Sequence, residues 1–218
     1  MSEQVISTGF VPRPLQFKVA AELKRFNVLV THRRFGKTHF LANLLIDRAL
    51  RCQLPMPRMY YVAPTFAMAK RIVWDVFKRY ASHLPGAEFN ENDLRIDFGH
   101  QKARIQLLSA ENPRANVGVY SDYVVFDEYG DQVPSVFTEV FRPTLSDRHG
   151  HASFAGTLRG TNHFYKLYEY AASGADPEWT GFNFKASETG IIPAAEIESL
   201  RRTMPEEEFL QEYENDPH

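Results

Sequence analysis

The sequence predicts an α/β domain whose mostly parallel β-sheet is covered by helices on both faces. Short apolar runs alternate along the chain with longer amphipathic segments, a pattern typical of strands connected by helices. Polar motifs follow three of the apolar runs directly, at residues 32–38, 127–128 and 156–157. Ligands bind at the carboxyl ends of the strands in such sheets, so the three motifs should meet at one edge.

Composition agrees with a folded domain and excludes several classes of protein. At 218 residues, 44% of them hydrophobic, the chain suits one α/β domain or one domain plus a tail. No apolar run is long enough to cross a bilayer, and the first residues do not read as a secretory signal. The single cysteine, Cys52, supports neither an internal disulfide nor a zinc site. We therefore expect no membrane partner and a reducing interior such as cytosol.

The charges are distributed unevenly along the chain. Residues 1–110 contain 17 Lys and Arg against 8 Asp and Glu, whereas residues 111–218 contain 8 against 19. A basic first half is suited to contacts with phosphates, because neutralising them releases condensed counterions. The alternative is that these are scattered solvated side chains whose stems pack against the surface.

The elements expected in the first half begin with a proline-broken, extended segment through Gln16. Apolar periodicity and turn residues then predict the following elements in order: a short helix at 17–25, a strand at 27–31, a helix at 37–51, a strand at 59–63, a helix at 66–81 and an antiparallel hairpin at 94–98 and 103–108.

The second half continues the alternation of strands and helices. Its expected elements are these: strands at 123–126 and 153–155, a helix at 161–172, a strand at 180–184 and helices at 193–202 and 206–214. We accordingly expect three parts, an N-terminal extension (1–26), a core (27–190) and a helical C-terminal subdomain or linker (191–218).

The first polar motif, Thr31-His-Arg-Arg-Phe-Gly-Lys-Thr38, corresponds to the phosphate-loop pattern G-x-x-x-x-G-K-[ST], with Thr31 in place of the first glycine. Gly36 allows the backbone to approach phosphates closely, and a helix amino terminus follows to face the anion. Lys37 would reach the terminal phosphates of ATP, and the Thr38 hydroxyl would bind Mg²⁺. Gly-Lys-Thr alone is a weak signal, and the competing interpretation is an ordinary helix start with an exposed lysine.

The second motif, Asp127-Glu128, ends the most apolar strand candidate, Tyr123-Val-Val-Phe126. Two carboxylates after buried residues need a cation or water nearby. Asp127 would hold Mg²⁺ through its water shell, and Glu128 would orient and deprotonate the attacking water. An acidic pair exposed at the rim of the sheet is the alternative.

The third motif is Gly156-Thr157, where a hydroxyl at a neighbouring strand end could sense the terminal phosphate. An ordinary glycine turn explains the motif equally well. His149 and His151 are not accompanied by the further ligands that a metal site requires.

Taken in order, these segments resemble the ATPase domain of the large terminase subunit, the DNA-packaging motor of tailed bacteriophages. The resemblance covers residues 12–157 and rests on the following segments: Pro12-Arg-Pro-Leu-Gln16, residues 32–38, Val62-Ala-Pro-Thr65, Tyr123-Val-Val-Phe-Asp-Glu-Tyr129, Arg142-Pro-Thr-Leu-Ser-Asp147 and Phe154-Ala-Gly-Thr157. It implies a P-loop NTPase of the additional-strand (ASCE) type. The implied function is Mg-dependent ATP hydrolysis that moves double-stranded viral DNA into a procapsid.

The resemblance also implies roles for individual residues. Gln16 would read the adenine edge, since an amide both donates and accepts, and Arg33 would respond to the terminal phosphate. Thr157 would couple hydrolysis to movement. ATP would be held by Gln16 and by the loop residues Arg33, Arg34, Phe35, Gly36, Lys37 and Thr38.

The implied setting is a ring of subunits, pentameric in better-known members. It would be docked on the portal protein of the procapsid in the host cytoplasm and supplied with DNA by a small terminase subunit. The family's trans-acting arginine would correspond to Val117, so Arg114, Arg142, Arg148 and Arg159 all remain candidates for it. Family members continue into a nuclease domain, whereas this sequence stops at His218, so we expect no DNA cleavage by this chain.

Two other functions share the same motifs. The first is a helicase or another DNA-remodelling ATPase, although 218 residues leave little room for the second motor domain of a helicase. The second is a nucleotide-gated assembly module that binds ATP without useful hydrolysis, an alternative kept open by Val117.

Overall fold

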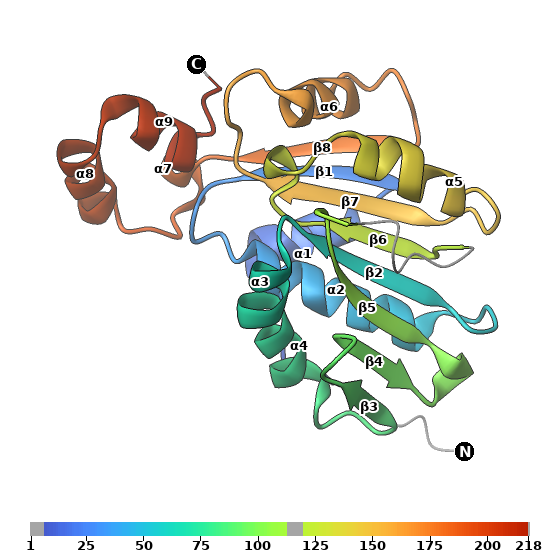
Figure 1. The fold of residues 1–218 in the computed structure, drawn as a ribbon. Coiled ribbons are helices and arrows are strands. Elements are labelled where there is room, and N and C mark those ends of the chain that lie inside the picture. The colour runs from blue at the N-terminus through green and yellow to red at the C-terminus, as the bar shows by residue number, and fades with distance from the viewer. Residues whose placement is uncertain (1–6, 113–119, 218) are drawn as a thin grey trace.

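A computed structural model describes residues 7–112 and 120–217, which form an eight-stranded sheet in the order β3-β4-β5-β2-β6-β7-β1-β8 (Figure 1). The strands have the following bounds: β1 Phe26–Thr31, β2 Arg58–Ala63, β3 Ala87–Asn90, β4 Arg95–Phe98, β5 Arg104–Ser109, β6 Tyr123–Phe126, β7 His151–Gly156 and β8 Trp179–Phe184. The six strands from β5 to β8 in this order pair in parallel, whereas β4 pairs antiparallel with both β5 and β3. The expected hairpin is therefore present at one end of a parallel sheet.

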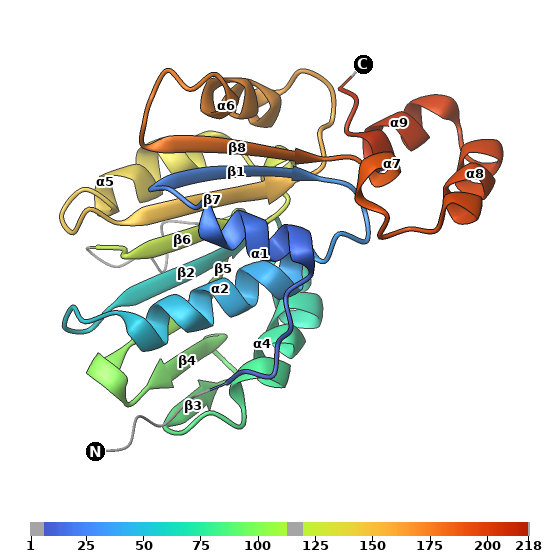
Figure 2. The same cartoon turned by 180° about the vertical axis from the view of Figure 1, so that it is seen from behind.

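Helices cover both faces of the sheet (Figures 1 and 2). The helical segments on one face and at its margin are these: α1 Pro14–Ala21, α2 Lys37–Arg51, α3 Phe66–Met68, the π-helical η1 Ala69–Val73 and α4 Trp74–Ala81. The other face carries these: the π-helical η5 Val136–Phe141, α5 Arg142–Thr144 and α6 His163–Ala172. Two short 3₁₀ turns are also present. Turn η2 His100–Lys102 lies between β4 and β5, and turn η4 Tyr129–Asp131 follows β6.

Two hydrophobic cores lie on either side of the sheet because successive side chains of a strand point to opposite faces. Leu29 and Tyr61 pack with α2 and α4 in one core, while Val28, Tyr60 and Phe126 pack with η5 and α6 in the other. Every residue of β1 is buried, as expected of a central strand in a sheet covered on both sides. The predicted layers are thus confirmed.

Strand β7 lies between β1, which precedes the phosphate-loop motif, and β6, which precedes the acidic pair. This inserted strand defines the additional-strand class of P-loop NTPases, so the predicted fold class is confirmed. The carboxyl ends of β1, β6 and β7 consequently lie together at one edge of the sheet.

Part of the prediction for the first 25 residues is wrong. The chain is not extended through Gln16, because α1 begins at Pro14 and ends at Ala21. Proline is well suited to the first turn of a helix, where the N–H that it lacks would have no partner. Arg13 is the extended N-cap, and its backbone N–H donates to the side chain of Gln16 at 2.9 Å.

Two further segments were not expected from the sequence. Strand β3 is mostly half-buried and shows no clear alternation of apolar and polar residues, so periodicity could not find it. The helical residues 136–144 follow Pro134 and contain Pro143, and these two prolines made the segment resemble a turn.

The C-terminal residues form a small helical unit that projects from the carboxyl edge of the sheet (Figure 1). Its helices are α7 Ala186–Thr189, α8 Ala194–Thr203 and α9 Glu206–Glu214. Ala186, Ile192, Phe209 and Tyr213 form its own core. We propose the division into residues 1–26, 27–190 and 191–218 as the domain organisation, noting that Ala186 already packs with the last part. Within the described residues, no helix combines the length and apolarity needed to cross a bilayer.

Candidate nucleotide-binding site

The loop between β1 and α2 has the backbone of an anion-binding turn. Gly36 is the N-cap of α2 in the left-handed region, with φ 90° and ψ 29°, a conformation that glycine adopts without strain. A Cβ at this position would also lie 2.9 Å from Nε2 of Gln16. Helix α2 starts at Lys37, so the first free N–H groups of a fifteen-residue helix face the loop.

Side chains at the start of α1 hold this loop from behind by donating hydrogen bonds to the carbonyl oxygens of the loop. The Arg13 Nη1 donates to the carbonyls of Arg34 at 2.7 Å and Phe35 at 3.0 Å. Gln16 Nε2 donates to the same Phe35 carbonyl at 3.0 Å. The contact of Arg13 with the loop was not expected from the sequence, although its place in the segment Pro12-Arg-Pro was a usable signal.

Gln16 is buried, and its side chain also borders an open cavity. With Gly36, His39 and Tyr80 it lines a space of about 440 Å³ on the α1 side of the loop. The volume suits a small planar group. That Gln16 reads an adenine edge stays a prediction.

The acidic pair meets the loop, as expected from the order of the strands. Thr38 Oγ1 donates to Asp127 Oδ2 at 3.3 Å, and Lys37 Nζ lies 3.5 Å from Glu128 Oε1. The Lys37 ammonium also donates to the Thr31 carbonyl at 3.4 Å. Two segments far apart in the sequence therefore enclose a single polar space in front of the helix amino terminus.

Burial makes Asp127 an unusual carboxyl group. Desolvation raises the pKa of Asp127 to about 6, and the neighbouring charge of Glu128 acts in the same direction. Tyr61 OH donates to Asp127 Oδ2 at 2.6 Å and, together with Thr38 and Lys37, favours the charged form. Tyr61 was not expected from the sequence, because nothing local distinguishes a tyrosine whose hydroxyl reaches Asp127 from the other residues of an apolar strand.

Glu128 is placed by the backbone and by the end of β7. Its φ of 48° and ψ of 52° lie in the left-handed region, which a residue with a Cβ seldom adopts. A Cβ at Gly156 would lie 3.3 Å from Glu128 Oε2, so the glycine allows the carboxylate to approach. Thr157 follows and is buried, at 4% exposed. The third motif therefore lies against the second, as expected.

The remaining loop arginine, Arg33, is paired with the C-terminal helices. Its Nε lies 2.7 Å from Glu212 Oε2, and its backbone N–H donates to the Glu212 carbonyl at 3.0 Å. Arg159, after β7, lies 3.8 Å from Glu212 Oε1 and 3.4 Å from Asp131 Oδ1. This ion-pair chain connects the loop, α9 and the turns after β6 and β7.

Comparison with known proteins identifies relatives along almost the whole chain. No family model matches the sequence. The large terminase subunit of Thermus phage G20c is 31% identical over 237 residues, and that of Escherichia phage T5 is 29% identical over 218 residues. These matches include 94% and 95% of this chain. The chain is a homologue of the phage terminase large subunit.

Solved structures agree with this relationship at the level of the fold. The large terminase ATPase domain of Thermus phage P74-26 has a TM-score of 0.80 and 22% identity, covering 97% of this chain and 96% of that domain. The chain spans about half the length of the curated relatives it matches, 48% in both cases.

Three of the candidates for a trans-acting arginine lie among the described residues of this terminase homologue, in different parts of the fold. Arg114 and Val117 lie outside the described residues. Arg159 contributes to the ion-pair chain beside the site, whereas Arg148 binds Asp122 at the start of β6, at the opposite edge of the sheet. Arg142 lies over the Phe26 ring, with 5.3 Å between its guanidinium carbon and the ring centroid.

The residues present in the terminase homologue fit a divalent cation at Thr38 and Asp127. A buried carboxyl group with a raised pKa gains from a cation nearby, and the Thr38 hydroxyl lies beside it. Residues 7–112 and 120–217 contain no group of three or more His, Cys, Asp and Glu side chains that could hold a metal. A cation here would therefore need oxygens from phosphate and water, which is the usual coordination of Mg²⁺.

Replacing Asp127 with asparagine should raise thermal stability in metal-free buffer at pH 8. The folded-state pKa of about 6 exceeds the ordinary 3.8, so the folded protein binds the extra proton more tightly. Ionisation of Asp127 therefore costs stability, progressively as pH rises through about 4 to 6, and the cost is complete above that window. We expect the Asp127→Asn variant to melt a few degrees higher at pH 8, with the difference vanishing near pH 4.

Thermal unfolding in EDTA between pH 4 and 8 measures this difference, with Glu198→Gln on the exposed face of α8 as the control. A variant that is less stable by the same amount at every pH would show that Asp127 is structural and not strained by its charge.

Proposed function

We propose that this chain is the ATPase motor domain of a terminase large subunit, which hydrolyses ATP with Mg²⁺ to move double-stranded DNA into a viral procapsid. The observation that supports this most is the meeting of Lys37 and Thr38 with Glu128 and Asp127 at one helix amino terminus. This arrangement combines an anion site, a cation site and a candidate base within one space.

Each part of the site has a chemical role in this proposal. The N–H groups of the loop Arg33–Thr38 and the Lys37 ammonium hold the phosphates, and Gln16 recognises the base. Thr38 and Asp127 hold Mg²⁺, which neutralises charge on the phosphate oxygens. Glu128 accepts a proton from the attacking water and orients it.

Arg33 and Thr157 connect the site to the rest of the chain. The Arg33 side chain is largely exposed beyond its contact with Glu212, so it is free to exchange that carboxylate for a terminal phosphate. Such an exchange would release one contact between the loop and α9. Thr157, directly after the glycine that backs Glu128, would transmit the change along β7.

The proposed setting is a homo-oligomeric ring, pentameric by resemblance, in the cytoplasm of the infected bacterial host. The ring would dock on a portal protein and receive DNA from a small terminase subunit. Charge on the transferred phosphate would be stabilised partly by an arginine from a neighbouring subunit, an effect worth about 10³–10⁵ in rate.

Phosphate release by the purified chain tests this proposal, measured over a wide range of protein concentrations with Mg²⁺ and with or without duplex DNA. We expect turnover per chain to be slow when the protein is dilute and to rise steeply as subunits associate. Fast turnover by a proven monomer would contradict the ring mechanism. Tight ATP binding without hydrolysis under every condition would instead favour a nucleotide-gated assembly module.

A further inference from the structure

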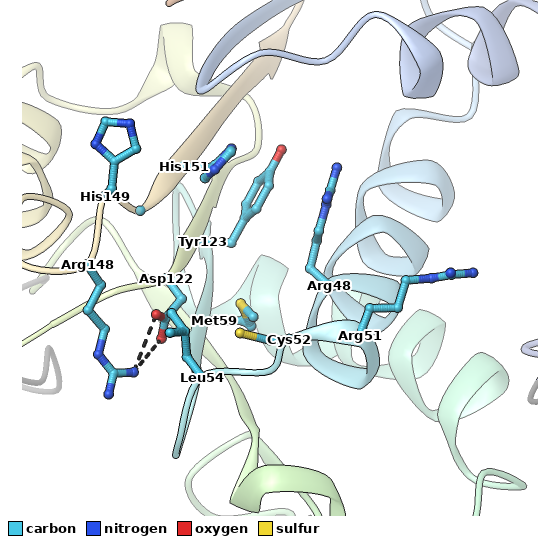
Figure 3. Close-up of a pocket in the computed structure, with 11 residues that line it drawn as sticks. Arg48, Arg51, Cys52, Leu54, Met59, Asp122, Tyr123, Arg148, His149 and His151 are labelled. Carbon is cyan, nitrogen blue, oxygen red and sulfur yellow. Dashed lines mark hydrogen bonds and ion pairs between the residues drawn. The ribbon is translucent and has the colours of Figure 1, made fainter.

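A pocket lined by several basic side chains lies at the edge of the sheet opposite the candidate nucleotide site (Figure 3). It has a volume of about 220 Å³ and lies between the last turn of α2 and the starts of β2, β6 and β7. Leu54, Met59 and Tyr123 supply apolar walls. The basic side chains around it are Arg48, Arg51, Arg148, His149 and His151.

Arg48 is the group in this pocket whose charge has no counterion among the described residues. Its Nε is buried and has no hydrogen-bond partner there, and the guanidinium extends alongside Tyr123, 5.9 Å from the ring centroid (Figure 3). A half-buried guanidinium without a carboxylate is costly. The cost indicates that an anion belongs beside it.

The carboxylates nearby are already engaged elsewhere. Asp122 accepts from the Arg58 backbone N–H at 2.7 Å and pairs with Arg148 at 3.3 Å. Asp47 pairs with Arg51 at 2.5 Å on the exposed side of α2. Neither acid neutralises Arg48, so the pocket keeps a net positive charge.

The positive charge of Arg48 also affects the protonation of His151 in the pocket wall. Desolvation lowers the pKa of His151 most, and the positive charges of Arg48 and Arg25 lower it further. His151 stacks on Tyr123 with ring centroids 5.8 Å apart. The wall is thus an aromatic surface in a positive field, to which an oxyanion is attracted.

We infer that this pocket binds one phosphate group of the DNA backbone, with Arg48 as the principal contact and Arg51 and His149 at its rim. The choice of DNA as the source of the phosphate rests on the proposed function. The unpaired Arg48 by itself indicates only that the pocket binds an anion such as phosphate. The pocket is smaller than typical small-molecule sites of about 300–1,000 Å³, so it admits one phosphate and not a nucleotide. Arg51 and His149 are largely exposed at the rim, where Arg51 pairs with Asp47 and His149 lies 3.5 Å from Glu178, so an added phosphate would compete with these carboxylates.

The proposed DNA contact and the candidate site of ATP hydrolysis lie at opposite edges of the sheet. The DNA contact lies at the amino ends of β2, β6 and β7, and the candidate base follows the carboxyl end of β6. Changes at Arg48 should therefore alter DNA binding without touching the residues proposed for hydrolysis.

The Arg48→Met variant tests the inference, because methionine keeps the unbranched stem and removes the charge. Binding of a short fluorescent duplex is measured by anisotropy at several salt concentrations, without nucleotide, against Arg202→Met on the exposed face of α8. We expect Arg48→Met to weaken binding about five- to ten-fold and to reduce the slope of log K against log salt by about 1. Arg202→Met should remain within about twofold of the unchanged chain.

Thermal unfolding supplies a readout that a purely structural arginine would not show. Without added anion, Arg48→Met should melt no lower than the unchanged chain, since a half-buried charge without a counterion is removed. Sodium phosphate should stabilise the unchanged chain more than sodium chloride of equal ionic strength, and this difference should disappear in Arg48→Met. Arg48→Lys, which keeps the charge, should retain most of the salt slope.

Equal duplex binding by Arg48→Met and Arg202→Met would overturn the inference. The same applies if phosphate stabilisation depends on Arg48 but duplex binding does not, because the pocket would then take a free anion and not DNA. Neither assay contains ATP. A negative result for duplex binding therefore does not contradict the ATPase proposal, and a chain that does not hydrolyse ATP can still be tested for DNA binding.

Discussion

Replacing Glu128 with glutamine should abolish ATP hydrolysis while leaving ATP binding intact. Glutamine keeps the size of the side chain beside Gly156 but cannot accept a proton from water, and loss of a positioned base costs about 10²–10⁴ in rate. The Glu128 carboxylate lies 3.5 Å from the Lys37 ammonium and competes with phosphate for it, and this competition is weakened in the glutamine variant. Affinity for ATP should therefore be unchanged or higher.

Phosphate release and binding of a fluorescent ATP analogue measure the two effects separately. Glu198→Gln, the same substitution on exposed α8, should change neither. If Glu128→Gln hydrolyses ATP at the normal rate, the assignment of the base is wrong. If binding is lost together with hydrolysis, Glu128 is required to shape the site.

Replacing Lys37 with methionine should remove tight ATP binding and, with it, hydrolysis. The Lys37 side chain is largely buried and anchored at the Thr31 carbonyl, so its ammonium is already positioned in front of the helix amino terminus. A charge-assisted contact with phosphate is lost and no other lysine replaces it in the loop. We expect an affinity loss of about 100-fold, corresponding to about 2.7 kcal/mol.

Titration of the ATP analogue, followed by calorimetry, checks this expectation. Lys70→Met, on the exposed side of η1, is the matched control and should bind normally. Normal affinity in Lys37→Met would mean that backbone N–H groups alone hold the phosphates. A fall in melting temperature of many degrees without ligand would show instead that Lys37 chiefly offsets the two carboxylates.

Much of the fold could be predicted because its signals are local. The helix at Lys37–Arg51 follows from apolar periodicity, and β6 follows from four apolar residues ending in a charged pair. Pro14 misled the prediction because proline breaks a helix interior but favours a first turn, and the sequence pattern does not distinguish these positions. Strand β3 escaped detection because an edge strand that is mostly half-buried does not need an apolar face.

The residues of the candidate site likewise fall into those that the sequence identifies and those that only the structure reveals. Gly36, Lys37 and Thr38 were identifiable because the conformation of one glycine and the start of one helix are decided within a few residues. Tyr61 and Glu212 were not, because their roles depend on contacts with Asp127 and Arg33 across long stretches of chain.

The sequence by itself determined an α/β phosphate-loop domain and the residues at the ends of its strands, since backbone conformation and side-chain periodicity are short-range properties. Only the tertiary structure decided that β7 separates β1 from β6, that Glu212 holds Arg33, and that Arg48 faces a pocket without a counterion. These features arise from the order and register in which distant strands pair, and no local pattern encodes which distant side chains will become neighbours.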